Sequence, residues 1–160
     1  MISLSVTMEH LELRRDGYCI TTDPERLDVD AIHAYLTRSY WAAGIPKETV
    51  ARSLHGALCF GLLHGAEQVG FARVISDRAT FAYLCDVYVL EQHQGRGLGK
   101  WLIGAVRNHP ELAGLRRFVL ATRDAQGLYA QYGFVPLARP EIFMEIVRPD
   151  IYRTKPPGAV

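Results

Sequence analysis

The segment QGRGLGKW, residues 94–101, limits most strongly how this chain can fold. It holds three glycines within five positions and directly follows a strand-like run, DVYV. After it, apolar residues recur at helical spacing, at Leu98, Trp101, Leu102, Ala105 and Val106. This order predicts a strand, a glycine-rich turn and a helix. The first amides of such a helix have no internal partner and favour an anion such as phosphate.

Two common phosphate-binding motifs do not fit this segment. A Walker loop requires a glycine where Gln94 stands and a serine or threonine where Trp101 stands. The dinucleotide fingerprint counted from Gly95 requires a glycine where Lys100 stands. From spacing alone, the segment is therefore either a turn without a ligand or a phosphate loop of another kind.

The rest of the chain alternates strand and helix patterns, which predicts an α/β (α+β) fold in a single domain over residues 1–160, with a core of about 15–150. Strands are expected at 18–23, three times within 57–90, and at 116–122, 134–138 and 142–147, and helices at 28–44, 46–56 and 124–133 besides the one after the glycines. Asp28 or Asp30 is the expected N-cap of the first helix. Short turns make the three central strands antiparallel, whereas the strand–helix–strand unit around the glycines predicts a parallel crossover. Both ends of the chain, about a dozen residues at the start and the tail from Arg153, are expected to be loosely held.

Composition excludes several classes of function. The chain has 160 residues, 49% of them hydrophobic, and a net charge of +1, so no broad basic surface suggests binding to nucleic acid or an acidic membrane. No apolar run is long enough for a membrane helix, and charge comes too early for a signal peptide, so a cytoplasmic location is expected. The three cysteines have no CxxC spacing and the six histidines are scattered, so no metal site is predicted.

The stretch DVYVLEQHQGRGLGKWLI resembles the signature segment of the GCN5-related N-acetyltransferase (GNAT) superfamily, through Gln94, Gly97 and Gly99. Downstream, LYAQYGF resembles the second helix and following strand of that family, from Leu128 to Phe134. The resemblance covers about residues 68–138, and the N-terminal third varies with substrate in this family. It implies a mixed, mostly antiparallel sheet of six to seven strands, splayed beside an acetyl-CoA site and flanked by about four helices.

The resemblance implies acetyl-CoA as cosubstrate. The amides from Gly95 to Lys100 would hold its pyrophosphate, and the main chain of the preceding strand would run beside its pantetheine arm. The cofactor-binding residues expected in this way are Val87, Tyr88, Val89, Gln94, Gly95, Arg96, Gly97, Leu98, Gly99, Lys100 and Asp124. Asp124 stands where many relatives have asparagine, and capping of the following helix is the role we favour for it.

Two residues are the expected catalytic groups. Tyr129 matches the tyrosine that donates a proton or a hydrogen bond to the departing sulfur in the family, and an ordinary phenol is protonated at neutral pH. Asp86 is either a base, acting directly or through water, or a structural aspartate tied to a nearby backbone group or arginine. Strict strand alternation puts Asp86 on one face with Leu84 and Tyr88. The amide of Val87 or Tyr88 is the expected oxyanion donor.

The acceptor is expected to bind at Tyr40, Trp41 and Tyr88, where aromatic rings beside Asp86 suit a cationic amine. Packing in the core or a lid is an equally good reading of Trp41. The chain is thus expected to move an acetyl group directly to a primary amine of a small molecule, in a ternary complex. A protein or peptide acceptor, a longer acyl donor and a catalytically silent CoA-binding module remain alternatives. Cys85 is the one residue that could carry the acetyl group covalently in a two-step reaction. A homodimer is also expected.

Overall fold

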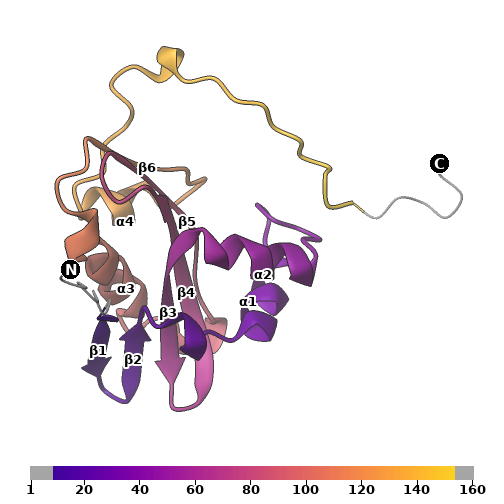
Figure 1. The fold of residues 1–160 in the computed structure, drawn as a ribbon, viewed down its shortest axis with the longest axis vertical. Coiled ribbons are helices and arrows are strands. Elements are labelled where there is room, and N and C mark those ends of the chain that lie inside the picture. The colour runs from indigo at the N-terminus through magenta and orange to yellow at the C-terminus, as the bar shows by residue number, and fades with distance from the viewer. Residues whose placement is uncertain (1–8, 154–160) are drawn as a thin grey trace, which may run out of the picture.

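The computed structural model describes residues 9–153, which form one six-stranded sheet. Its strands follow one another in sequence order across the sheet: β1 Glu12–Arg15, β2 Tyr18–Thr21, β3 Ala57–His64, β4 Glu67–Ser76, β5 Phe81–Val89 and β6 Arg117–Leu120. All neighbours are antiparallel except β5 and β6, which are parallel (Figure 1). The mixed, mostly antiparallel sheet and the parallel crossover are therefore confirmed.

Within residues 9–153, four α-helices cover the two faces of this sheet: α1 Val29–Leu36, α2 Lys47–His55, α3 Leu98–Arg107 and α4 Gln126–Ala130. Figure 1 shows α1 and α2 on one side of the long strands and α3 on the other. Each side has its own core. The α3-side core includes Leu84, Leu102 and Val106, and the α1/α2-side core includes Phe71 and Tyr88. Among the described residues, no helix is long and apolar enough to cross a membrane.

The first strand was not expected from the sequence. Residues 1–8 lie outside the described part, but residues 12–15, which were expected to be loosely held, pair with β2. The turn between them is Asp16–Gly17, with φ of 50° and 82°. Both residues having positive φ is the requirement of a two-residue hairpin turn, and the Asp-Gly pair is the signal that could have found this strand.

The first helix is shorter than expected. Its N-cap is Asp28, one of the two residues predicted, since Asp28 Oδ1 accepts from the amide of Ala31 at 3.0 Å. It ends at Leu36 instead of Gly44 because Ser39 takes over the local hydrogen bonds. The Ser39 hydroxyl donates to the Leu36 carbonyl at 2.7 Å and accepts from the Ala42 amide at 3.1 Å.

The two strands predicted at 134–138 and 142–147 are wrong. Residues 134–153, here called the C-terminal arm, contain one 3₁₀ turn at Pro140–Ile142 and no strand. The residues have strand-like side chains, but a strand needs a partner edge, and Pro136 and Pro140 have no amide to contribute to one. Figure 1 shows the arm arching away from the sheet.

Candidate active site

A gap opens between β5 and β6 where their pairing stops. The last paired residues are Leu84 and Leu120, while β5 continues to Val89. The edge of β5 that faces β6 is therefore unpaired from Cys85 onward, among the residues that the structure describes. This is the separation of strands expected from the sequence, and the predicted site residues lie around it.

A β-bulge shapes this part of β5. Cys85 lies opposite Arg73 and Tyr88 opposite Phe71, so two residues of β5 face one residue of β4. Asp86, within the bulge, has a φ of 54°, which is rare for a residue other than glycine. The bulge interrupts the alternation of faces.

The assignment of faces by strict alternation is accordingly wrong for Leu84. Leu84 packs in the α3-side core together with Val87 and Val89, and only Tyr88 packs in the α1/α2-side core. Alternation failed because it assumes two residues per repeat throughout the strand, and the bulge adds one.

Asp86 is held by two side chains. Its Oδ2 accepts from Arg73 Nε at 2.9 Å, and its Oδ1 accepts from Trp41 Nε1 at 2.9 Å. The Asp86 side chain is only 9% exposed, so the guanidinium of Arg73 balances a nearly buried charge. Sequence reasoning missed Arg73. Its position in the middle of the otherwise apolar run VGFARVI was a signal, because a cation there needs a buried partner.

The glycine loop connects β5 to α3. Gly95 and Gly97 have φ of 80° and 74°, and Gly97 is the N-cap of α3. Trp101 is the first residue whose amide donates back into the helix, to the Gly97 carbonyl at 3.1 Å. A side chain added at Gly95 or Gly99 would meet nothing within 4 Å, so open space lies beside the loop. Gln94 fastens the loop to β5, because its side-chain amide donates to the Val89 carbonyl at 2.9 Å.

Three cationic side chains line one hollow at this loop: Arg15, Arg96 and Lys100. Arg15 comes from β1, and its guanidinium lies 4.7 Å from the centre of the Trp101 ring and donates to the Gly97 carbonyl at 3.4 Å. The positive end of α3 thus has three cations and one carboxylate, Asp16, around it, and this excess of positive charge suits an anionic ligand. Arg15 was missed because it belongs to the strand that the sequence analysis did not predict. Leu98 is buried in the α3-side core, so only its main chain can face the loop's surroundings.

Tyr129 lies on α4, on the opposite side of the gap from Asp86. Its ring is half-buried and packs edge-on against Phe134, with the centroids 5.9 Å apart. Burial, and to a smaller extent Tyr40, raises the pKa of Tyr129 above its ordinary value. Its hydroxyl has no hydrogen-bond partner among the described residues. Tyr129 and Asp86 line one cavity of about 350 Å³, so the structure brings the two expected catalytic residues together.

Tyr40 and Trp41 form the exposed rim of this cavity. Tyr40 is 54% exposed and its ring meets Trp41 edge-on at 5.1 Å. The guanidinium of Arg123, which the sequence analysis did not single out, lies 3.9 Å from the centre of the Tyr40 ring. Because Tyr40 precedes α2 and Arg123 precedes α4, this contact joins the two sides of the gap.

Tyr88 does not line the cavity with its side chain. It is 4% exposed and stacks on Tyr35 at 3.9 Å in the α1/α2-side core. Burial raises the pKa of Tyr88, and its buried hydroxyl has no partner among the described residues. Of the roles predicted for Tyr88, its main chain at the bulge is available for contacts with acetyl-CoA and for donation to the oxyanion.

Cys85 and Asp124 are also among the residues that line the cavity. Burial raises the pKa of the Cys85 thiol to about 12, so it stays protonated at neutral pH. The expected capping role of Asp124 is wrong. The N-cap of α4 is Ala125, without a side-chain bond, and the nearby cap-like contact comes from Thr122, whose hydroxyl accepts from the Ala125 amide at 3.1 Å.

The comparisons with known proteins all find acetyltransferases. The family model described as the acetyltransferase (GNAT) domain matches residues 55–136. A protein of Gibberella zeae that is named as an acetyltransferase is 36% identical, over 73% of this chain and 78% of that protein. A crystal structure assigned to the GNAT family, from Xanthomonas campestris, superposes with a TM-score of 0.85 and is 50% identical, covering 88% of this chain and 100% of that one. A GNAT structure from Elizabethkingia anophelis with acetyl-CoA bound shares the fold, with a TM-score of 0.53 and 18% identity over 74% of this chain and 76% of that one.

Proposed function

Since the chain belongs to the GNAT family and is an acetyltransferase, we propose that it moves the acetyl group of acetyl-CoA directly to a primary amine of a small molecule. One observation carries this proposal: the gap between β5 and β6 has the glycine loop at one end and Asp86 and Tyr129 on its two sides. The proposed anion site and the proposed proton donor thus lie around one unpaired strand edge, beside the cavity.

The loop fits the anionic part of the donor. Its amides are unpaired at the start of α3, its glycines leave open space, and Arg15, Arg96 and Lys100 supply positive charge. Val87 offers its main-chain groups on the edge that β6 leaves free, and Val89 offers its amide, because its carbonyl already accepts from Gln94. Asp124, on the other side of the gap, is proposed to contact the same ligand. When bound, acetyl-CoA supplies an acetyl group on a thioester, which is activated toward an amine.

The residues of the chain supply the remaining chemistry. Tyr129 keeps its proton at neutral pH, because its pKa is raised, and its hydroxyl can donate that proton to the sulfur that leaves as the C–S bond breaks. The amine loses one proton as the C–N bond forms, and that proton restores the phenol, directly or through water. The amide of Val87 or Tyr88, at the bulge, is the proposed oxyanion donor. For Asp86 we propose a positioning role, since its two oxygens already accept from Arg73 and Trp41. A base role would require it to accept a proton while it holds both contacts.

The acceptor cavity supports a small substrate. Its volume of about 350 Å³ lies at the lower end of the range for small-molecule pockets. Arg73 balances the charge of Asp86, and Arg123 already lies over the Tyr40 ring, so attraction for a cationic amine falls to the ring face of Trp41 and to Asp124. A protein or peptide acceptor is the second candidate, because Tyr40 and Trp41 are exposed at the rim. We also propose that the protein acts as a homodimer.

Titration calorimetry with acetyl-CoA tests the donor, and two glycine variants make the test specific. Gly95 and Gly114 both have positive φ, of 80° and 76°, and open space where a side chain would be added. Gly95→Ala should weaken acetyl-CoA binding about tenfold, because alanine resists positive φ and its methyl group occupies the ligand side of the loop. Gly114→Ala introduces the same strain in a distant turn and should leave the affinity unchanged.

Release of free thiol across a panel of polyamines, amino acids, aminoglycosides and peptides tests the acceptor. Turnover of a small amine with no turnover of peptides supports the proposal. Turnover of peptides alone favours the second candidate. Tight binding of acetyl-CoA with no acceptor turned over favours a silent module, and no binding at millimolar acetyl-CoA overturns the loop assignment.

A further inference from the structure

The cavity beside the gap has one cation that no carboxylate balances. Three charged side chains line it: Asp86, Arg123 and Asp124. Asp86 is paired with Arg73. Arg123 and Asp124 follow each other in the chain, yet within residues 9–153 no ion pair joins them, and neither pairs with another residue. This part of the chain therefore gives the cavity one positive and one negative charge that are both unpaired.

An aromatic ring, and not a hydrogen bond, places the guanidinium of Arg123. The guanidinium lies 3.9 Å from the centre of the Tyr40 ring, at the rim of the cavity. The main-chain carbonyl of Arg123 accepts from Gln126 Nε2 at 3.5 Å, but the side chain of Arg123 donates to no other described residue. A contact with the face of a ring uses no hydrogen-bond donor, so the N–H groups of this guanidinium stay available to a ligand.

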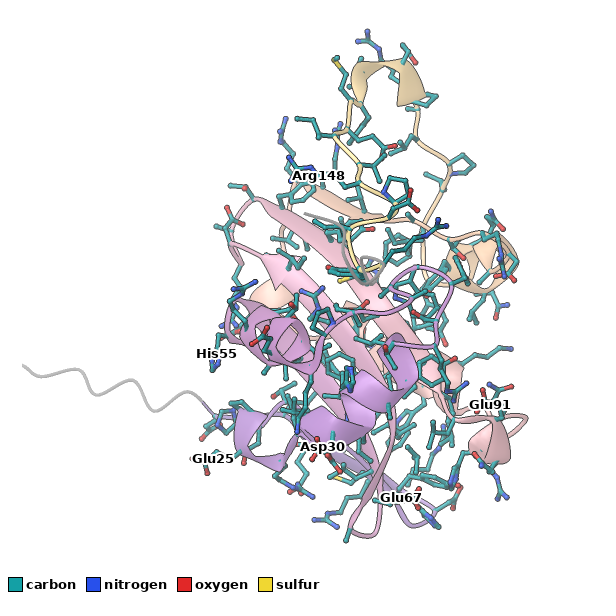
Figure 2. All side chains as sticks on the ribbon, turned by 90° about the vertical axis from the view of Figure 1, so that its right-hand side faces the viewer. Glu25, Asp30, His55, Glu67, Glu91 and Arg148 are labelled. Carbon is teal, nitrogen blue, oxygen red and sulfur yellow. The ribbon has the colours of Figure 1, made fainter. Side chains whose placement is uncertain are left out.

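Other arginines that lie over rings differ in this respect. Arg38 lies 4.4 Å from the centre of the Tyr35 ring, and it also donates to the carboxylate of Glu91 at 2.9 and 3.1 Å. Figure 2 labels Glu91 at the edge of the side of the molecule that carries α1 and α2. Arg15 likewise donates to a carbonyl of the glycine loop. These arginines have protein partners for their donors, whereas the donors of Arg123 point to a ligand.

The charge of Arg123 is separate from the site proposed for acetyl-CoA. The hollow at the glycine loop and the cavity share no lining residue. Arg123 lines the same cavity as Asp86 and Tyr129, where the acceptor is proposed to bind. An anionic group bound by Arg123 therefore belongs to the acceptor and not to the pyrophosphate of the donor.

We propose that Arg123 binds a carboxylate group of the acceptor, so that the acceptor is an amino acid in the broad sense, a small molecule with both a primary amine and a carboxylate. The assignment of this site to the acceptor rests on the proposed function. A guanidinium presents its N–H groups in a planar fork that matches the two oxygens of a carboxylate. The carboxylate of Asp124 attracts the ammonium form of the same molecule as it enters the cavity.

The unpaired charges also select against other small amines. A polyamine would bring further positive charge toward Arg123, and like charges brought together in a site oppose binding. A phosphate carries up to two negative charges, and Arg123 can balance only one of them, with Asp124 beside it. A carboxylate carries the single charge that Arg123 can balance.

Matched acceptors test the carboxylate site. Each amino acid of a panel is compared with the amine that lacks its carboxylate, such as lysine with cadaverine and phenylalanine with phenethylamine, and with a phosphate-bearing amine of similar size. The kcat/KM for each is measured from the release of free thiol. For an amino acid that is acetylated, kcat/KM should exceed that of its matched amine about 30-fold, mostly through KM, as expected for hydrogen bonds between charged groups.

Variants of Arg123 assign this preference to one side chain. In Arg123→Gln, the ratio of kcat/KM between an amino acid and its matched amine should fall to within about threefold of one. Arg123→Lys keeps the charge without the fork, so its ratio should be intermediate. Arg116→Gln is the control. It removes the charge of an exposed arginine that does not line the cavity, and it should keep the wild-type ratio.

Three results would overturn the carboxylate site. If Arg123→Gln weakens both members of a pair equally, then Arg123 only holds Tyr40 in place. A wild-type ratio near one means that the carboxylate is not bound. A higher kcat/KM for the phosphate-bearing amine than for every amino acid means that Arg123 selects a different anion.

Calorimetry with coenzyme A present separates the carboxylate site from the proposed function. The probe is the amino acid with the highest kcat/KM or, without turnover, each amino acid of the panel. An amino acid that binds wild type at least tenfold more tightly than Arg123→Gln, but is not acetylated, would contradict the proposed function and leave the carboxylate site standing. Acetylation of small amines at rates that do not depend on a carboxylate would support the proposed function and overturn the carboxylate site.

Discussion

The two walls of the cavity differ in how their polar groups are satisfied. On the β5 wall, Asp86 accepts from Arg73 and Trp41 and is almost buried. On the α4 wall, the hydroxyl of Tyr129 has no partner among the described residues, although its ring is packed against Phe134. Both oxygens of Asp86 already accept hydrogen bonds, so this carboxylate can hold neighbouring side chains in position. The ring of Tyr129 is packed but its hydroxyl is unpaired, so that hydroxyl can bind a ligand.

The two walls also differ in charge. The β5 wall has an ion pair whose charges cancel, and the Cys85 thiol beside it stays neutral because burial raises its pKa to about 12. The α4 wall has two charged residues, Arg123 and Asp124, and a neutral phenol whose proton is retained by burial. Proton donation is therefore expected from the α4 wall and positioning of the amine from the β5 wall.

The largest effect is expected from Tyr129→Phe, which removes the unpaired hydroxyl and keeps the ring packing. The turnover number should fall about 100-fold, which is within the ordinary contribution of a general acid. Acetyl-CoA affinity, measured by calorimetry, should change less than threefold.

Tyr132→Phe is the matched control for this variant. The Tyr132 hydroxyl donates to the Lys100 carbonyl at 2.7 Å, close to the glycine loop. Its loss should affect acetyl-CoA affinity more than turnover, the reverse of the pattern for Tyr129→Phe. If the turnover number of Tyr129→Phe equals that of wild type, then the α4 wall does not supply the proton, and the proposed difference in role between the two walls is wrong.

A smaller effect is expected from Asp86→Asn. The amide oxygen can still accept from Trp41, but Arg73 loses its counter-charge in a nearly buried site. The KM for the amine should rise about tenfold with a smaller fall in turnover number, and the free energy of unfolding should fall by about 3–5 kcal/mol. Steady-state kinetics and urea unfolding give these quantities.

Trp41→Phe sharpens this test. It removes the hydrogen bond from Trp41 to Asp86 and leaves the charge of Asp86 paired with Arg73. It should raise the KM for the amine in the same way, with little effect on stability. The base role would be restored instead if Asp86→Asn lowered turnover more than 100-fold and removed the acidic limb of the pH profile, while Trp41→Phe did not.

The pH profile gives a third contrast between the walls. Tyr129 must be protonated to donate, and its pKa is raised by burial, so activity should hold as pH rises past 9 and fall only above the ordinary phenol value of about 10. The measurement is the turnover number from pH 6 to 11 at saturating substrates. In Tyr129→Phe this basic limb should be absent, and a limb that persists would belong to another group.

The sequence predicted best what is determined locally. The strand, the glycine loop and α3 follow one another within twenty-odd residues, and the loop's positive φ values require the glycines that mark it. The bulge at Asp86 could not be predicted, because an aspartate with positive φ has no pattern of its own and depends on Arg73 and Trp41, which are distant in sequence.

The strand predictions for the C-terminal arm were wrong for a different reason. Residues 142–147 have the side chains of a strand, but pairing depends on an edge, and strand propensity does not say which edge or which chain provides it. Arg15 and Arg123 were missed in the same way, since β1 and the contact with Tyr40 bring them to the site from elsewhere in the chain.

The smallest effect is expected from Cys85→Ala, on the β5 wall. Cys85 lines the cavity, and it is the residue through which a covalent acetyl-enzyme could form. With a pKa of about 12, however, fewer than about one thiol in a thousand is ionised at pH 8, and the thiolate is the nucleophilic form. Turnover should therefore stay within about twofold of wild type, and mass spectrometry after incubation with acetyl-CoA alone should find no added acetyl group on the chain. An acetylated Cys85, or a loss of turnover comparable to that of Tyr129→Phe, would make the β5 wall a reacting surface and replace direct transfer by a two-step route.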